Sequence, residues 1–135
     1  MSRTIEGGCL CGAVRSRIQG EPLASGTCQC RTCRKASAAV IVPWLHLNAA
    51  QLSFTAGKPV EFKSSPPVTR SFCGRCGTPL TYWTTSDGPT IDVTTCSLDD
   101  PDAFPPIAHV WTSHKLGWVQ LADGLPCLDE GPPAE

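Results

Sequence analysis

Residues 68 to 84 read VTRSFCGRCGTPLTYWT, and this stretch decides the fold. Branched and aromatic residues flank the central CGRCG, which favours two strands, Val68 to Phe72 and Leu80 to Thr84, joined by a tight turn. Gly77 can adopt a positive φ directly after the second cysteine. The stretch therefore predicts a β-hairpin with Cys73 and Cys76 at its tip, both sulfurs directed to one side.

Seven of the nine cysteines fall into three closely spaced groups. They are the C-x-C pair Cys9 and Cys11, the C-x-C-x-x-C triplet Cys28, Cys30 and Cys33, and the C-x-x-C pair Cys73 and Cys76. Zinc takes four tetrahedral ligands, and closely spaced thiolates converge on it readily. We expect the two pairs to form one closed, structural site and the triplet to hold a second zinc with an open position, which is typical of catalysis. In the alternative grouping, one further cysteine joins the triplet, and the cysteines that remain form incomplete metal sites.

Three cations lie in or beside the triplet, namely Arg31, Arg34 and Lys35. One interpretation is that they are ordinary solvated charges. The other is that they offset the thiolates and hold the carboxylates of a small anionic thiol. We keep all three as candidate substrate contacts.

Length and composition bound the class of protein. The chain has 135 residues with 13 Pro, 12 Gly and one Met, which indicates one domain of short strands and many turns. Lys plus Arg number 11 against 12 for Asp plus Glu, so neither nucleic acid nor a membrane surface is the expected partner. No leader segment or membrane span is apparent, and we expect a cytoplasmic protein whose odd number of cysteines serves metal rather than disulfides.

The expected elements are those of an all-β protein. Predicted strands follow the C-x-C pair around residues 13–18 and recur at 40–47, 52–54, 60–63, 68–72, 80–84, 90–95, 110–111 and 118–121, with Pro43 marking an edge or a bulge. Short helical turns are expected within 34–39 and 99–106. We predict a single zinc-binding domain over residues 1–128 and a flexible C-terminal tail over 129–135.

Four segments together resemble one family. GGCLCGAV at 7–14, CQCRTCRKAS at 28–37, FCGRCGTPL at 72–80 and HVWTS at 109–113 are similar in order and spacing to the glutathione-dependent formaldehyde-activating family. The resemblance covers nearly the whole chain. It departs at Gln29, where typical members carry His, and this weakens a proton shuttle or substrate contact at that position.

The resemblance implies a fold, two metals and an activity. The fold is a β-tent of small stacked antiparallel sheets stapled by zinc. The structural zinc falls on Cys9, Cys11, Cys73 and Cys76, and the functional zinc on Cys28, Cys30 and Cys33. The implied enzyme is a carbon–sulfur lyase, similar to S-(hydroxymethyl)glutathione synthase, which adds a small thiol such as glutathione to formaldehyde or a related aldehyde.

A non-enzymatic, zinc-stapled binding module is the competing interpretation, because a fold does not fix a function. In that case a fourth side chain, His109, His114 or Cys96, closes the triplet site. The two histidines flank Trp111 and are also weak candidates for substrate contacts. A sulfoxide reductase on the same scaffold ranks lower, because it would need a second isolated C-x-x-C pair.

Other residues receive structural interpretations. His46 is expected to be a core or rim histidine, Cys96 a small buried hydrophobe, and Cys127 a free thiol without a role. Exposed edge strands make a homodimer a further prediction.

Overall fold

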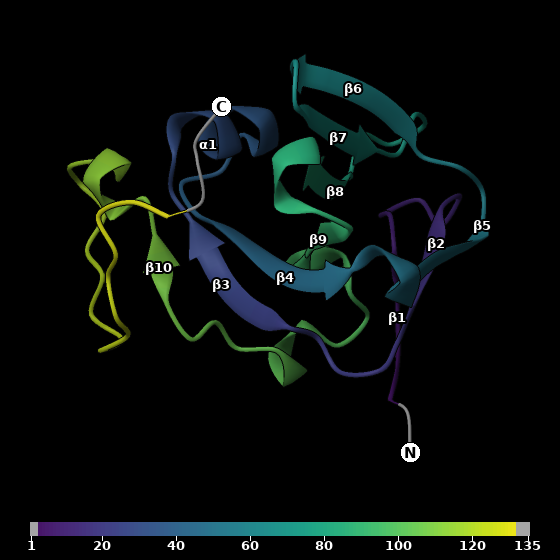
Figure 1. The fold of residues 1–135 in the computed structure, drawn as a ribbon, viewed down its shortest axis with the longest axis horizontal. Coiled ribbons are helices and arrows are strands. Elements are labelled where there is room, and N and C mark those ends of the chain that lie inside the picture. The colour runs from purple at the N-terminus through teal and green to yellow at the C-terminus, as the bar shows by residue number, and fades with distance from the viewer. Residues whose placement is uncertain (1–2, 132–135) are drawn as a thin grey trace.

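Two β-sheets make up most of the regular secondary structure in the computed structural model, which describes residues 3–131 (Figure 1). A three-stranded sheet has the order β1-β2-β5, and a seven-stranded sheet has the order β10-β3-β4-β9-β8-β7-β6. The strands are β1 (Thr4–Gly8), β2 (Arg15–Gln19), β3 (Ala24–Cys28), β4 (Val42–Asn48), β5 (Leu52–Ala56), β6 (Val60–Ser65), β7 (Val68–Phe72), β8 (Pro79–Thr84), β9 (Thr90–Thr94) and β10 (His109–Val110). The all-β prediction is confirmed.

Nearly every strand pair is antiparallel, as expected, but β10 pairs with β3 in parallel. β10 is only two residues long, and a separate segment follows its other side. The His109 amide donates to the Pro126 carbonyl at 2.9 Å, and the Leu128 amide donates to the His109 carbonyl at 2.8 Å. This end of the seven-stranded sheet is therefore flanked by the chain itself.

The main core lies between the two sheets. Its buried members are Ile5, Ile18, Leu45, Leu47, Val93, Leu98 and Phe104. Successive side chains of a strand point to opposite faces, so Leu45 and Leu47 of β4 enter this core while Val42, Trp44 and His46 face the other side of the sheet. The core thus holds β4 rigidly and presents its second face to the site.

Pro43 lies in a central strand, not at the expected edge. β4 runs between β3 and β9, and Pro43 pairs with Thr27 on one side. Pairing with β9 begins only at Trp44. The proline is tolerated because it precedes that ladder and has no partner there to which an N–H would donate.

One short α-helix, α1 (Arg31–Ser37), lies immediately after β3. It begins three residues before the expected turn because the Cys30 sulfur caps it, accepting a hydrogen bond from the Cys33 amide at 3.4 Å. It ends at Ala38, which is left-handed with φ 50°. The cap places Cys30 and Cys33 together at the first turn of the helix.

Two further predictions concern the C-terminal quarter. The expected strand at residues 118–121 is wrong: these residues form no strand, and Trp118 is exposed. The expected turn within 99–106 is present as a single 3-10 turn at Pro101–Ala103. The domain boundary at 128 stays a prediction; the Asp129 carbonyl accepts from the Ser113 amide, and residues 132–135 lie outside the described part.

Among the described residues, no helix is both long and apolar enough to span a membrane.

Candidate metal centres and the adjoining cavity

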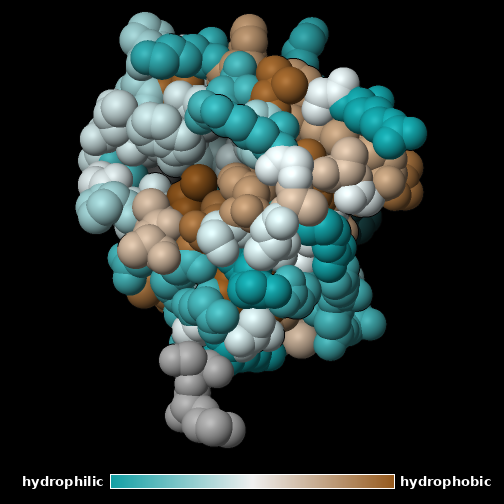
Figure 2. All heavy atoms as spheres, turned by 90° about the vertical axis from the view of Figure 1, so that its right-hand side faces the viewer, coloured by the Kyte–Doolittle hydropathy of each residue, from teal (hydrophilic) through white to brown (hydrophobic). Residues whose placement is uncertain are grey.

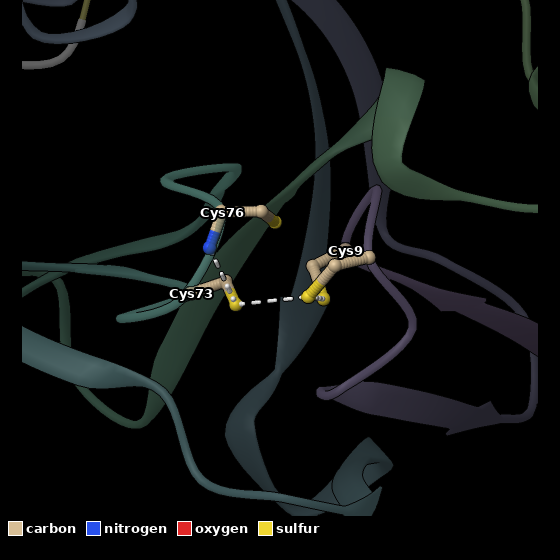
Figure 3. Close-up of side chains that lie close together, drawn as sticks. Cys9, Cys73 and Cys76 are labelled. Carbon is tan, nitrogen blue, oxygen red and sulfur yellow. Dashed lines mark hydrogen bonds between the residues drawn. The ribbon is translucent and has the colours of Figure 1, made fainter.

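The four sulfurs of the two cysteine pairs converge between two loops (Figure 3). Cys9 and Cys11 lie in the loop between β1 and β2, and Cys73 and Cys76 lie in the turn between β7 and β8. All four sulfurs are within 4.8 Å of one another; Cys9 to Cys11 is 3.6 Å and Cys11 to Cys73 is 3.8 Å. A tetrahedron with metal–sulfur bonds of about 2.3 Å has edges of about 3.8 Å. The donor set therefore fits a metal ion of this size.

Local hydrogen bonds favour the thiolate form of Cys9 and Cys76, whereas the pKa of Cys11 is raised to about 11, because a hydrogen bond with the Ala13 backbone is outweighed by burial and the neighbouring cysteine sulfurs. The amides of Arg75 and Cys76 both donate to the Cys73 sulfur at 3.4 Å. The Thr78 side chain, 3.2 Å from the Cys76 sulfur, lowers the pKa of that thiol to about 5. A hydrogen bond from the Val14 amide likewise lowers the pKa of Cys9. Hydrogen bonds that favour the charged form reduce the cost of deprotonating the ligands.

The triplet forms a second, more deeply buried cluster. Cys28 ends β3, Cys30 caps α1, and Cys33 lies in the first turn of the helix. The three sulfurs are within 4.8 Å of one another, and all three residues are buried. Among the described residues, no further His, Cys, Asp or Glu ligand atom joins this group.

Burial and crowding set the charge on the triplet. Hydrogen bonds from Cys28 and Cys33 strongly lower the pKa of Cys30, whereas hydrogen bonding to Cys30 and Cys33, together with burial, strongly raises the pKa of Cys28. Three adjacent thiolates repel one another in a low-dielectric site. A divalent cation removes that repulsion, so the triplet too is chemically suited to a metal.

A cavity of about 420 Å³ opens beside the triplet. Cys28, Cys30 and Cys33 line it at one end, and Trp44, Tyr82 and Trp111 contribute aromatic walls. Arg70 also lines it, with its Nη2 3.9 Å from the Cys33 sulfur and its guanidinium carbon 4.9 Å from the centre of the Tyr82 ring. The cavity therefore joins a cluster of thiols to a mostly apolar channel.

The sheet register explains why these side chains share one face. Arg70 pairs with Tyr82, Tyr82 with Asp92, Asp92 with His46, and His46 with Ala24. Directly paired residues point to the same side of a sheet. One row across five strands thus supplies much of the wall and floor of the cavity.

His46 is a wall residue of this cavity rather than a core residue. Its Nδ1 lies 2.5 Å from the Asp92 carboxylate. That hydrogen bond raises the pKa of His46, and partial burial opposes the shift. The ring is therefore held in one orientation at the cavity wall.

The three cations predicted as substrate contacts do not line the cavity. Arg31 and Lys35 are exposed on α1. Arg34 donates to the carbonyls of Gln29 and His114, both at 3.1 Å, and so fastens α1 to the neighbouring loop. The helix begins at residue 31, so these side chains project from its outer faces rather than towards the sulfurs.

The two histidines flanking Trp111 also differ from expectation. His109 is buried, and both ring nitrogens have partners: Thr27 at 2.6 Å and Asp123 at 2.8 Å. His114 stacks against Trp111 with ring centres 4.8 Å apart. Neither lines the cavity or joins the triplet.

Cys96, Cys127 and Gln29 lie outside the cavity. Cys96 is exposed, so the expectation of burial is wrong, and Cys127 is exposed as a free thiol. Neither belongs to either cluster. Gln29 is fully buried and does not line the cavity, so a substrate contact is not available at this position: its side chain points away from the face on which the flanking cysteines converge.

The sequence did not predict that Arg70 and Asp92 line the cavity, nor which of the tryptophans, Trp44 and Trp111, do so. Alternation along Val42, Trp44 and His46 was the available signal, because these three share a face of β4. Trp111 carries a structural signal instead: its φ of 56° is unusual for a bulky residue.

The fold and the two clusters define a small all-β protein with two cysteine groups that can each hold a metal ion. The chain belongs to the glutathione-dependent formaldehyde-activating enzyme family, whose model matches residues 4–114. A crystal structure of a Rhodobacter sphaeroides protein has a similar fold, with a TM-score of 0.59 and 21% identity over 70% of this chain and 87% of that one. Comparison with curated protein sequences gives no significant match.

Proposed function

We propose that the chain is a zinc enzyme that joins a small thiol, such as glutathione, to formaldehyde or a related aldehyde. The observation that carries the proposal is the position of three buried cysteine sulfurs at the end of an open cavity. The family name supplies the two reactants. In the reverse direction the reaction is that of a carbon–sulfur lyase.

The residues divide into two metal sites. Cys28, Cys30 and Cys33 would hold a functional zinc, which supplies a fourth position for a thiol and lowers the pKa of that thiol. The set of Cys9, Cys11, Cys73 and Cys76 would hold a closed, structural zinc that ties the β1–β2 loop to the β7–β8 turn.

The addition balances without any redox partner. The thiol loses its proton, its sulfur forms a bond to the carbonyl carbon, and the carbonyl π pair moves to oxygen, which takes up a proton. The product is a hydroxymethyl thioether. Arg70 lies beside the sulfur cluster, where its positive charge offsets thiolate charge, and the aromatic walls keep water away from the reacting groups.

Exchange spectroscopy tests the proposal, because the uncatalysed addition is reversible. The zinc-loaded chain should accelerate exchange between ¹³C-labelled formaldehyde and its adduct with glutathione or another thiol. Cys30→Ser should abolish the acceleration while the protein stays folded, and Cys96→Ser, at an exposed cysteine outside both clusters, should not. A folded Cys30→Ser protein with full activity refutes the assignment and favours the binding-module alternative.

A further inference from the structure

The first observation concerns the charges along the cavity. Among the described residues that line the cavity, Arg70 is the single Arg or Lys, and its guanidinium already contacts the Cys33 sulfur and the Tyr82 ring. Two carboxylates, Asp87 and Asp92, also line it. Among the described lining residues the cationic side chains already have partners, Arg70 with Cys33 and Tyr82 and His46 with Asp92, so a ligand's carboxylate would meet Asp87 without an uncommitted cation.

The two ends of the cavity are well separated. Cys28 pairs with Val42 and Ala24 pairs with His46, so the triplet and the His46–Asp92 pair are four residue steps apart along each strand. At about 3.3 Å per residue this is roughly 13 Å. Trp44, Tyr82 and other apolar groups line the space between them.

We infer that the thiol accepted here has an extended apolar or aromatic body and no carboxylate at its far end, in contrast to glutathione. This inference rests on the proposed function, because it assumes that the sulfur lies at the triplet. Burial of an apolar chain against Trp44 and Tyr82, whose ring centres lie 5.9 Å apart, favours binding by the hydrophobic effect. Asp92 and Asp87 disfavour a negative terminus by like-charge repulsion.

Matched thiols of the required length test the inference. Calorimetric titration of the zinc-loaded chain would compare 8-mercapto-1-octanol, 8-mercaptooctanoate and glutathione. The alcohol should bind at least about tenfold more tightly than either carboxylate-bearing thiol. Asp87→Asn with Asp92→Asn should narrow the gap between the alcohol and the octanoate, whereas Asp102→Asn, at an exposed carboxylate outside the cavity, should leave it unchanged.

Two outcomes overturn the inference in different ways. If the octanoate or glutathione binds as tightly as the alcohol, the inference fails and the proposed function stands. If none of the three thiols binds the zinc-loaded protein, both fail. A gap that persists unchanged in the double Asp variant also contradicts the proposed cause.

A second, independent observation concerns the free edge of β6. β6 ends the seven-stranded sheet opposite β10, and its Val60 and Phe62 side chains are 45% and 62% exposed. β6 lies at the top of Figure 1, and Figure 2 shows apolar side chains reaching the surface at that level. An exposed apolar edge strand is normally protected, because it offers unpaired backbone groups to another strand.

The charges on this strand select its partner. Glu61 and Lys63 flank Phe62 and are both exposed. When two copies of β6 pair antiparallel with Phe62 opposite Phe62, each Glu61 faces the Lys63 of the other copy. The geometry points to a second copy of this chain as the occupant of the edge, in a two-fold symmetric dimer.

Swapping the charges at positions 61 and 63 tests whether the dimer forms through this antiparallel pairing of two β6 strands. Sedimentation velocity over a concentration series should find a dimer for the wild-type chain. Glu61→Lys should raise its dissociation constant at least about tenfold, because Lys then faces Lys twice, and Glu61→Lys with Lys63→Glu should restore it. Asp102→Lys makes the same charge change away from the edge and should have no effect. A wild-type monomer throughout, or a dimer indifferent to Glu61→Lys, overturns the proposal.

Discussion

The guanidinium of Arg70 lies 3.9 Å from the Cys33 sulfur, although the two residues are 37 positions apart in the chain. Arg70 is buried, and the Tyr82 ring beneath its guanidinium holds it against the sulfur cluster. A buried cation at this position opposes the rise in the pKa of Cys33, which hydrogen bonding to Cys30 and burial bring to about 11. β7 therefore contributes a charge beside the cysteine triplet formed by the end of β3 and the start of α1.

Arg70→Gln should weaken the metal at the triplet without changing the four-cysteine site. Removal of the cation takes away a positive charge beside the buried Cys33 sulfur, so deprotonation on metal binding becomes less favourable. We expect the zinc affinity of the triplet to fall at least about tenfold, measured by competition with a chromophoric chelator. Arg75→Gln, at an exposed position in the C-x-x-C turn, is the matched control. Equal zinc affinities in both variants would contradict the role given to Arg70.

The His46–Asp92 pair predicts a pH dependence of stability. The hydrogen bond to Asp92 raises the pKa of His46 above its ordinary value of about 6.5. The stabilisation is therefore fully present below that ordinary pKa and is lost as the pH rises through the raised pKa. The free energy of unfolding of the wild type should exceed that of His46→Gln more at about pH 5.5 than at about pH 9. His114→Gln is the control, and a difference that grows with pH would refute the prediction.

Local spacing was sufficient to predict both cysteine clusters, the hairpin over residues 68–84 and the all-β class. The reason is that neighbouring cysteines within each pair and within the triplet lie two or three positions apart, so a compact turn brings them together, and the need of zinc for four ligands then joins the two pairs across 62 positions. Arg70, Tyr82, Asp92 and His46 could not be assembled in this way. They meet because four strands align in one register, and register depends on pairings between distant segments. The same limit explains Arg31, Arg34 and Lys35, whose closeness in sequence to the triplet did not place them in the cavity.

Gly57→Ala should destabilise the fold and disturb the four-cysteine site together. Gly57 has φ +66°, and an added Cβ would lie 2.1 Å from the Ala13 carbonyl oxygen, in the loop that holds Cys9 and Cys11. We expect a loss of more than about 1 kcal/mol in the free energy of unfolding, with weaker zinc binding at this site. Gly124→Ala separates backbone strain from the clash, because its φ is +76° but nothing lies within 4 Å of the new Cβ. Equal losses in the two variants would contradict the clash.

The two metal ions should leave the protein in separate steps. In the proposed structural site, four thiolates from Cys9, Cys11, Cys73 and Cys76 would enclose the metal and join two distant loops, so its release would be coupled to local unfolding. The triplet lines a cavity, and a competing chelator could approach a metal held there from the cavity side. Titration with a chelator, monitored by elemental analysis and circular dichroism, should remove one equivalent of zinc while the strand signal is retained. The second equivalent should leave only as that signal is lost.

Two variants assign the steps to the two sites. Cys73→Ser should shift the loss of structure to lower chelator concentration, whereas Cys33→Ser should remove the first step and leave the second unchanged. Simultaneous release of both ions in the wild type, in step with unfolding, would show that the two sites are not divided into a structural and an accessible one.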